Sequence, residues 1–125
     1  MMDMDIAAVF SKMPGGYDLY EAVEAALLGR FPEVEIEVRK TQISFRERYI
    51  FGTASLPIRK IKSAPERYII VSFGLSHRVV DPRIFEAVEA YPNRWTHHVL
   101  VSDAEQVDGQ LMDWLAEARE FALTK

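Results

Sequence analysis

The sequence contains no cysteine, and it has few of the features that mark a specialised class of protein. The absence of cysteine excludes disulfide frameworks, thiolate zinc sites, iron–sulfur clusters and cysteine nucleophiles. Only 6 glycines and 6 prolines occur, with no repeat, linker or low-complexity tract. No apolar run approaches the roughly 20 residues that span a bilayer, and the acidic start differs from a basic secretory signal. We therefore expect a cytoplasmic protein with no membrane partner.

The residues that are present describe one ordinary domain. Of the 125 residues, 49% are hydrophobic and 27% are charged. A chain of this length buries about two-thirds of its unfolded surface, which is enough for a core of its own. We expect residues 1–125 to form a single soluble domain that needs no cofactor, and the composition leaves a homodimer possible.

The net charge of −4 hides an uneven distribution along the chain. Residues 1–38 carry two basic and eight acidic side chains, and residues 68–125 carry five basic and nine acidic ones. Residues 39–67 reverse this balance, with eight basic and two acidic side chains. We call residues 39–67 the basic segment. Its basic residues are Arg39, Lys40, Arg46, Arg48, Arg59, Lys60, Lys62 and Arg67.

Apolar residues recur at helical spacing in four parts of the chain. The helices predicted from this spacing cover residues 6–13, 18–29, 83–90 and 102–121. Capping boxes, Asp18 with Glu21 and Ser102 with Glu105, are predicted to open the second and fourth helices. Pro92 is predicted to close the third.

Between these helices the apolar residues alternate with polar ones, which is typical of half-buried strands. The predicted strands lie at residues 36–38, 43–45, 49–55, 68–73 and 96–101. Short polar connections favour antiparallel hairpins. Because helices flank the strands instead of alternating with them, we predict an α+β fold, an antiparallel sheet of about five strands with helices packed on one face.

Two predicted loops gather side chains that suit a ligand. One is the run 91–98, which brings a guanidinium, an indole and two imidazoles to the start of a strand, and the other follows the strand at 68–73. Bidentate and stacking contacts from these groups would hold a small anionic or planar ligand. The predicted ligand-binding residues are His77, Arg78, Asn93, Arg94, Trp95, His97 and His98. The alternative is structural, with Trp95 closing the end of the sheet and Arg94 paired with a carboxylate.

Neither metal binding nor catalysis has a signature in the sequence. His97 and His98 are adjacent, so on a strand they point to opposite faces and cannot easily chelate one ion. His97 shares its parity with Val99, which favours a packed or hydrogen-bonded imidazole. Ser76 and His77 are also adjacent, which aims their side chains apart, and no nucleophile elbow is present. We predict no metal site and no catalytic residues, and a non-catalytic binding module is favoured over an enzyme.

The basic segment supports an alternative function. On strands, Arg46, Arg48, Arg59 and Lys60 could contact phosphate groups, with aromatic rings nearby for stacking. This pattern would make the chain an accessory domain for nucleic acid or for an acidic partner. The opposing interpretation is that these charges balance the acidic helices and keep sheet edges from pairing.

Several short motifs resemble a known family. They include Tyr17-Asp18-Leu19-Tyr20-Glu21, Lys40-Thr41-Gln42-Ile43-Ser44-Phe45, Asp81-Pro82, Arg94-Trp95 and Val99-Leu100-Val101-Ser102-Asp103. In order and spacing they are similar to a small family of bacterial and archaeal domains of unknown function. Its members stand alone or form the C-terminal part of proteins described as predicted transport proteins or containing nuclease-like domains. The resemblance implies an α+β domain without assigned catalytic residues, so it carries no site over to this chain.

Overall fold

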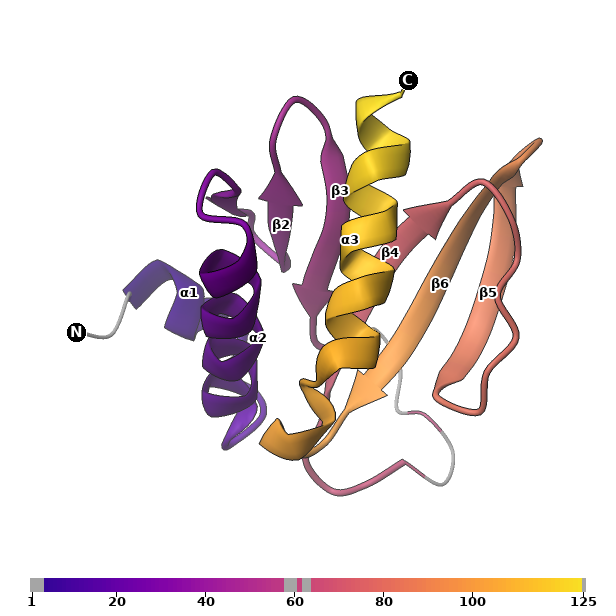
Figure 1. The fold of residues 1–125 in the computed structure, drawn as a ribbon. Helices are drawn as coiled ribbons and strands as arrows, with labels where there is room; N and C mark the ends of the chain where they lie inside the picture. The colour runs from indigo at the N-terminus through magenta and orange to yellow at the C-terminus, as the bar shows by residue number, and fades with distance from the viewer. Residues whose placement is uncertain (1–3, 58–60, 62–63, 125) are drawn as a thin grey trace.

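The computed structural model describes residues 4–57, 61 and 64–124, which form three α-helices, one short 3₁₀ helix and six strands (Figure 1). In chain order these are α1 (Met4–Val9), α2 (Gly16–Arg30), β1 (Glu35–Val38), β2 (Gln42–Arg46), β3 (Ile50–Ser55), β4 (Ile69–Leu75), β5 (Ile84–Tyr91), β6 (Arg94–Val101), η1 (Ala104–Gln106) and α3 (Gly109–Leu123). All six strands belong to one sheet in the order β1-β2-β3-β4-β6-β5, and every neighbouring pair is antiparallel. The α+β prediction is confirmed, with six strands instead of about five. Within the described ranges, no helix is long and apolar enough to cross a membrane.

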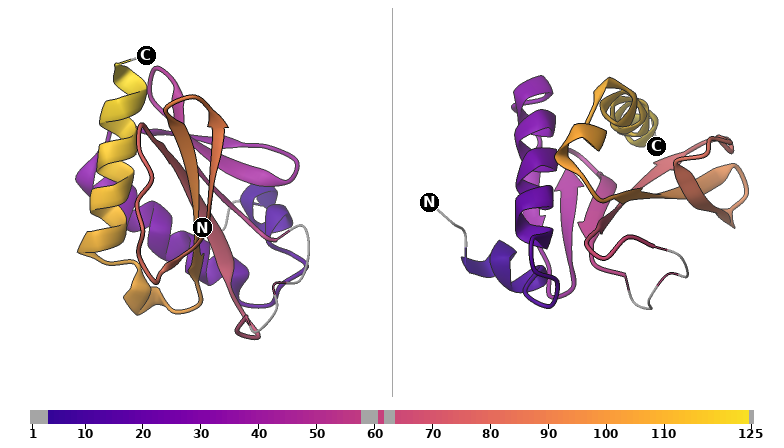
Figure 2. Two further views of the ribbon diagram at one scale, coloured as in Figure 1. Left: turned by 90° about the vertical axis from the view of Figure 1, so that its right-hand side faces the viewer. Right: turned by 90° about the horizontal axis from the view of Figure 1, so that it is seen from below.

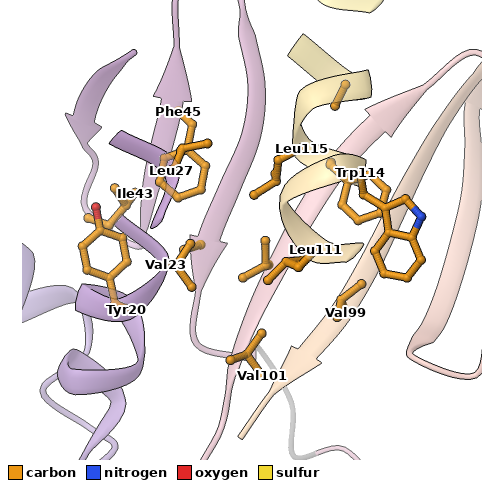
Figure 3. Close-up of a cluster of buried hydrophobic side chains, with 14 of the residues drawn as sticks. Tyr20, Val23, Leu27, Ile43, Phe45, Val99, Val101, Leu111, Trp114 and Leu115 are labelled. Atoms are coloured by element: carbon orange, nitrogen blue, oxygen red, sulfur yellow. The ribbon is translucent and has the colours of Figure 1, made fainter. Parts of the chain in front are cut away.

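The core lies between the sheet and the two long helices, α2 and α3, which cover the same face of the sheet (Figures 1 and 2). The alternating pattern of the strands explains this layer, because most of the side chains on one face of the sheet are apolar and point toward the helices. We call the face of the sheet that packs against α2 and α3 the covered face, and the opposite face of the sheet the open face. Figure 3 shows core side chains from both layers: Tyr20, Val23, Leu27, Leu111 and Leu115 from the helices, and Ile43, Phe45, Val99 and Val101 from the sheet.

The helix predicted at 83–90 is wrong, because this segment is strand β5. β5 pairs with β6 through a hairpin whose two turn residues are Pro92 and Asn93. Proline fixes φ for the first turn position, and Asn93 takes the second with φ 63. Pro92 therefore closes a strand, and cross-strand pairing overrides the helix preference of the alanines and glutamates in this segment.

Both predicted capping boxes are also wrong. α2 begins before Asp18, and its N-cap is Gly15, which has φ 83 and makes no side-chain capping bond. Ser102 lies outside α3, and its backbone N–H donates to the side chain of Gln106. Asp103 caps the 3₁₀ helix η1 instead, and Asp108 caps α3. The chain thus bends once between β6 and α3, where a single continuous helix was expected.

Arg83 fastens the start of β5 to the start of α3. Its Nη1 donates to Asp108 Oδ1 at 2.9 Å and to Gln110 Oε1 at 3.0 Å, and its Nη2 donates to the carbonyl of Gln106. The guanidinium also lies 5.7 Å from the ring centre of Trp114. These contacts fix the position of the edge strand β5 relative to α3.

Candidate functional site

A row of polar side chains crosses the open face of the sheet, one from each strand. The strand register places these six residues opposite one another in the sequence Glu37, Ser44, Thr53, Ser72, His98 and Glu86. Directly opposed residues in antiparallel strands have their side chains on the same face, about 4.5–5.5 Å apart at Cβ. We call this set the polar row. Side chains that are distant in the sequence are therefore neighbours on this face.

A pocket of about 730 Å³ lies over the polar row. Thr53, Ser72, His98 and Glu86 belong to the row and line this open-face pocket. Its remaining described lining is polar at Gln42, Ser55 and Thr96 and apolar at Leu56, Pro57, Ile61, Ile70 and Phe85. Apolar side chains beside a few convergent polar groups are the usual lining of a small-molecule site.

Three members of the row are in polar contact with one another. Ser72 Oγ lies 2.7 Å from His98 Nδ1, and His98 Nε2 lies 3.8 Å from Glu86 Oε1. Burial lowers the pKa of His98 below its ordinary value, and the Glu86 carboxylate opposes that shift only in part. His98 is therefore mainly neutral at pH 7, with one ring nitrogen able to accept a proton.

His97, by contrast, belongs to the covered face. It is fully buried, its ring stacks on Phe73 at 5.1 Å, and its Nε2 accepts a hydrogen bond from the backbone N–H of Val79 at 2.9 Å. Burial lowers the pKa of His97, against the opposing effect of the Phe73 and Trp95 backbone groups. This imidazole packs in the core and closes the loop after β4.

The other predicted ligand residues are spread over separate places. Arg78 lies over the ring of Trp95 at 5.9 Å, so these two do come together. His77 instead points to α3, with Nε2 3.4 Å from Glu117. Asn93 and Arg94 are exposed, one in the β5–β6 turn and the other at the first position of β6.

Only one of the seven predicted ligand residues, His98, is among the described residues that line the open-face pocket. The lining residues that sequence reasoning missed include Ser72, Thr53, Glu86 and Phe85. Strand parity could have placed Ser72 on the face of His98. Glu86 and Phe85 were out of reach, because their segment was predicted as a helix.

The described residues include only part of the basic segment. Arg46 Nη1 lies 3.8 Å from Glu37 Oε2, and the Arg48 guanidinium lies 5.5 Å from the ring centre of Tyr49. Arg59 and Lys60 lie outside the described residues. Arg46 therefore balances an acidic neighbour within the molecule, and Arg48 has an aromatic face beside it.

Metal ligands do not cluster in the part of the chain that the structure describes. No group of three or more histidine, aspartate or glutamate side chains is placed there to hold an ion. The pair His98 and Glu86 falls short of the ligand count of an all-protein site.

The comparisons with known proteins give a family and no activity. The model of a family described as "Domain of unknown function (DUF5655)" matches residues 6–122. No curated protein and no solved structure matches the chain. The family match therefore assigns no role to the open-face pocket.

Proposed function

The chain belongs to the DUF5655 family of domains of unknown function, and we propose that it is a binding domain whose open-face pocket takes a small planar ligand. The observation that carries this proposal is the pocket over the polar row, whose lining combines hydrogen-bonding and apolar side chains. Its volume of about 730 Å³ is within the usual range of small-molecule sites, about 300–1,000 Å³.

The lining supports a flat ligand with polar edges. Hydroxyl, amide and imidazole groups in the lining can donate and accept hydrogen bonds with ring heteroatoms. Phe85 is 41% exposed beside them and offers an aromatic surface for stacking. A planar ring would therefore bond through its edge while its faces contact the apolar side chains.

The charge of the described lining favours a neutral or cationic ring over an anion. Glu86 contributes a carboxylate to the described lining. A carboxylate next to a bound anion is repulsive, and a neutral imidazole does not offset it. Of the two ligand classes predicted from the sequence, the planar class is the one we propose.

Thermal shift measurements with a panel of nucleosides, free nucleobases, aromatic amines and small anions test the proposal. A ligand at about 100 times its Kd raises the free energy of unfolding by about 2.7 kcal/mol, which is a measurable rise in Tm. We expect a planar compound to stabilise the wild type and to lose that effect in Phe85→Ala and His98→Gln.

The control variants are Arg94→Ala and Trp95→Ala, which change predicted ligand residues outside the described pocket lining. Each is expected to keep the ligand-induced shift measured against its own Tm. Loss of the shift in these two variants, with Phe85→Ala unaffected, would place the ligand at the end of the β5–β6 hairpin. A panel without any stabilising compound would contradict the binding proposal.

A further inference from the structure

Ser72, His98 and Glu86 form a hydroxyl–imidazole–carboxylate series in the lining of the open-face pocket. Ser72 Oγ is within hydrogen-bond distance of His98 Nδ1, at 2.7 Å, and Glu86 Oε1 lies on the other side of the ring, 3.8 Å from Nε2, at ion-pair distance. The order of the three groups is the one by which a serine is activated. We propose that Ser72 is a nucleophile that takes the acyl group of a small carboxylic ester, with His98 as its general base. This inference rests on the proposed function, because the ester must first occupy the pocket.

The Glu86 carboxylate near Nε2 favours one tautomer of His98. An ionised Glu86 can only accept, so it favours the tautomer with the proton on Nε2. That tautomer leaves the Nδ1 lone pair facing the Ser72 hydroxyl. Because burial also keeps the imidazole neutral at pH 7, His98 is ready to receive the serine proton.

The proposed reaction needs only the ester and water. Ser72 Oγ forms a bond to the carbonyl carbon while its proton passes to His98 Nδ1. The bond from that carbon to the alcohol oxygen then breaks, and the alcohol leaves with the proton. Water attacks the acyl-serine next, giving one proton to His98, which returns it to Ser72 Oγ as the carboxylic acid departs.

Side chains next to Ser72 supply the rest of the site. Backbone N–H groups of a central strand are engaged in the sheet, so the donor to the developing oxyanion has to be a side chain. Thr53 is directly opposite Ser72 on the neighbouring strand and lines the same pocket, which suits its hydroxyl to that role. The apolar lining at Phe85 and Ile70 favours an uncharged aryl or short alkyl ester.

The chain contains a matched comparison. Ser76 Oγ lies 3.5 Å from His77 Nδ1, and His77 Nε2 lies 3.4 Å from Glu117 Oε2. This second set has the same three residue types, but all three side chains are exposed and none lines the open-face pocket in the described residues. Ser76 therefore lacks the enclosure that keeps a bound ester next to the serine, and Ser76→Ala is the control.

Hydrolysis of p-nitrophenyl butyrate and labelling by a fluorophosphonate probe test the proposal on the full chain. We expect release of p-nitrophenol and a probe adduct that peptide mass spectrometry assigns to Ser72. Ser72→Ala should abolish both. His98→Gln should slow labelling by about 100-fold or more, which is the usual contribution of a general base. Ser76→Ala should react like the wild type.

Three results would overturn the proposal: an unlabelled wild type, an adduct that persists in Ser72→Ala, or equal loss in Ser76→Ala. The adduct is mapped on the wild type, so the test does not depend on the stability of a variant. Binding is separated from chemistry by the thermal shift panel. If a planar compound stabilises the wild type and the probe forms no adduct, Ser72 is not a nucleophile, but the binding proposal stands.

Discussion

Replacing Asp108 by alanine removes two hydrogen bonds that meet at one carboxylate oxygen. Asp108 Oδ1 accepts from the backbone N–H of Leu111 at 3.0 Å and from Arg83 Nη1 at 2.9 Å. Loss of a helix N-cap costs about 1 kcal/mol. The ion pair is partly exposed, with side-chain exposures of 22% for Arg83 and 46% for Asp108, so it adds about 0.2–1 kcal/mol. We expect Asp108→Ala to lower the free energy of unfolding by about 1–2 kcal/mol.

Urea denaturation at pH 7 measures this loss from the shift in the unfolding midpoint. Asp108→Asn keeps an acceptor for the helix N–H and loses the charge, so it should cost less than the alanine variant. Asp103→Ala is a matched control, because Asp103 caps the short η1 with one bond to the Glu105 N–H and pairs with no arginine among the described residues. A double-mutant cycle with Arg83→Gln isolates the ion pair.

The pH dependence gives a second check. The Leu111 N–H, aided by Arg83, holds the pKa of Asp108 below its ordinary value. A carboxylate with a lowered pKa stabilises the fold fully above its unfolded pKa and loses that contribution as pH falls through the lower folded value. The difference in the free energy of unfolding between wild type and Asp108→Ala should therefore become smaller below about pH 4. A cost below about 0.3 kcal/mol, or a gap that widens in acid, would refute this account of how β5 is fastened to α3.

Two further predictions concern the histidines and the basic segment. The pKa values of His97 and His98 are both lowered in the folded state, so the unfolded chain binds protons more readily at these two residues. The stability that the two neutral histidines contribute should therefore be complete above about pH 6.5 and decrease as the pH falls below it. Each histidine changes the free energy of unfolding by at most about 1.4 kcal/mol per pH unit. In urea titrations between pH 5 and 7.5, His98→Gln should make the free energy of unfolding less dependent on pH. If the basic segment binds nucleic acid, affinity in filter-binding assays should fall steeply with salt, and the triple Arg→Gln variant at Arg46, Arg48 and Arg59 should weaken it. If binding does not change with salt concentration, or if no binding occurs at low salt, the basic residues serve only to balance acidic side chains of the same molecule.

The hydrophobic pattern was sufficient to predict the covered face of the sheet. Ile43 and Phe45 alternate with polar neighbours, and both lie in the core against α2 and α3. Alternation of this kind has one physical solution, which is burial of the apolar side. The class of the fold follows from it.

β5 could not be predicted from local sequence. Its alanines and glutamates favour a helix, and Pro92 occurs where a helix would also end. The strand exists because β6 pairs with it across the Pro92-Asn93 turn, a contact between segments that a local pattern does not report.

The candidate site escaped prediction for a related reason. Parity assigns Ser72 and His98 each to a face of a strand, but it does not say which residues oppose each other. A shift of two residues between β4 and β6 would keep every apolar side chain in the core and separate these two. The observed register, with Ser72 opposite His98, is what creates the contact.

The strand order also has a consequence for the synthesis of the protein. β6 lies between β4 and β5 in the sheet, although it follows both in the chain. When β5 leaves the ribosome it has no strand to pair with, and it joins the sheet only after residues 94–101 have been made and inserted beside β4. Glu86 and Phe85 travel with β5, so the open-face pocket is completed late, by contacts between distant parts of the chain. A nascent chain that ends before β6 can pair only β1–β4 of the six strands, and it lacks His98 in the lining of the pocket.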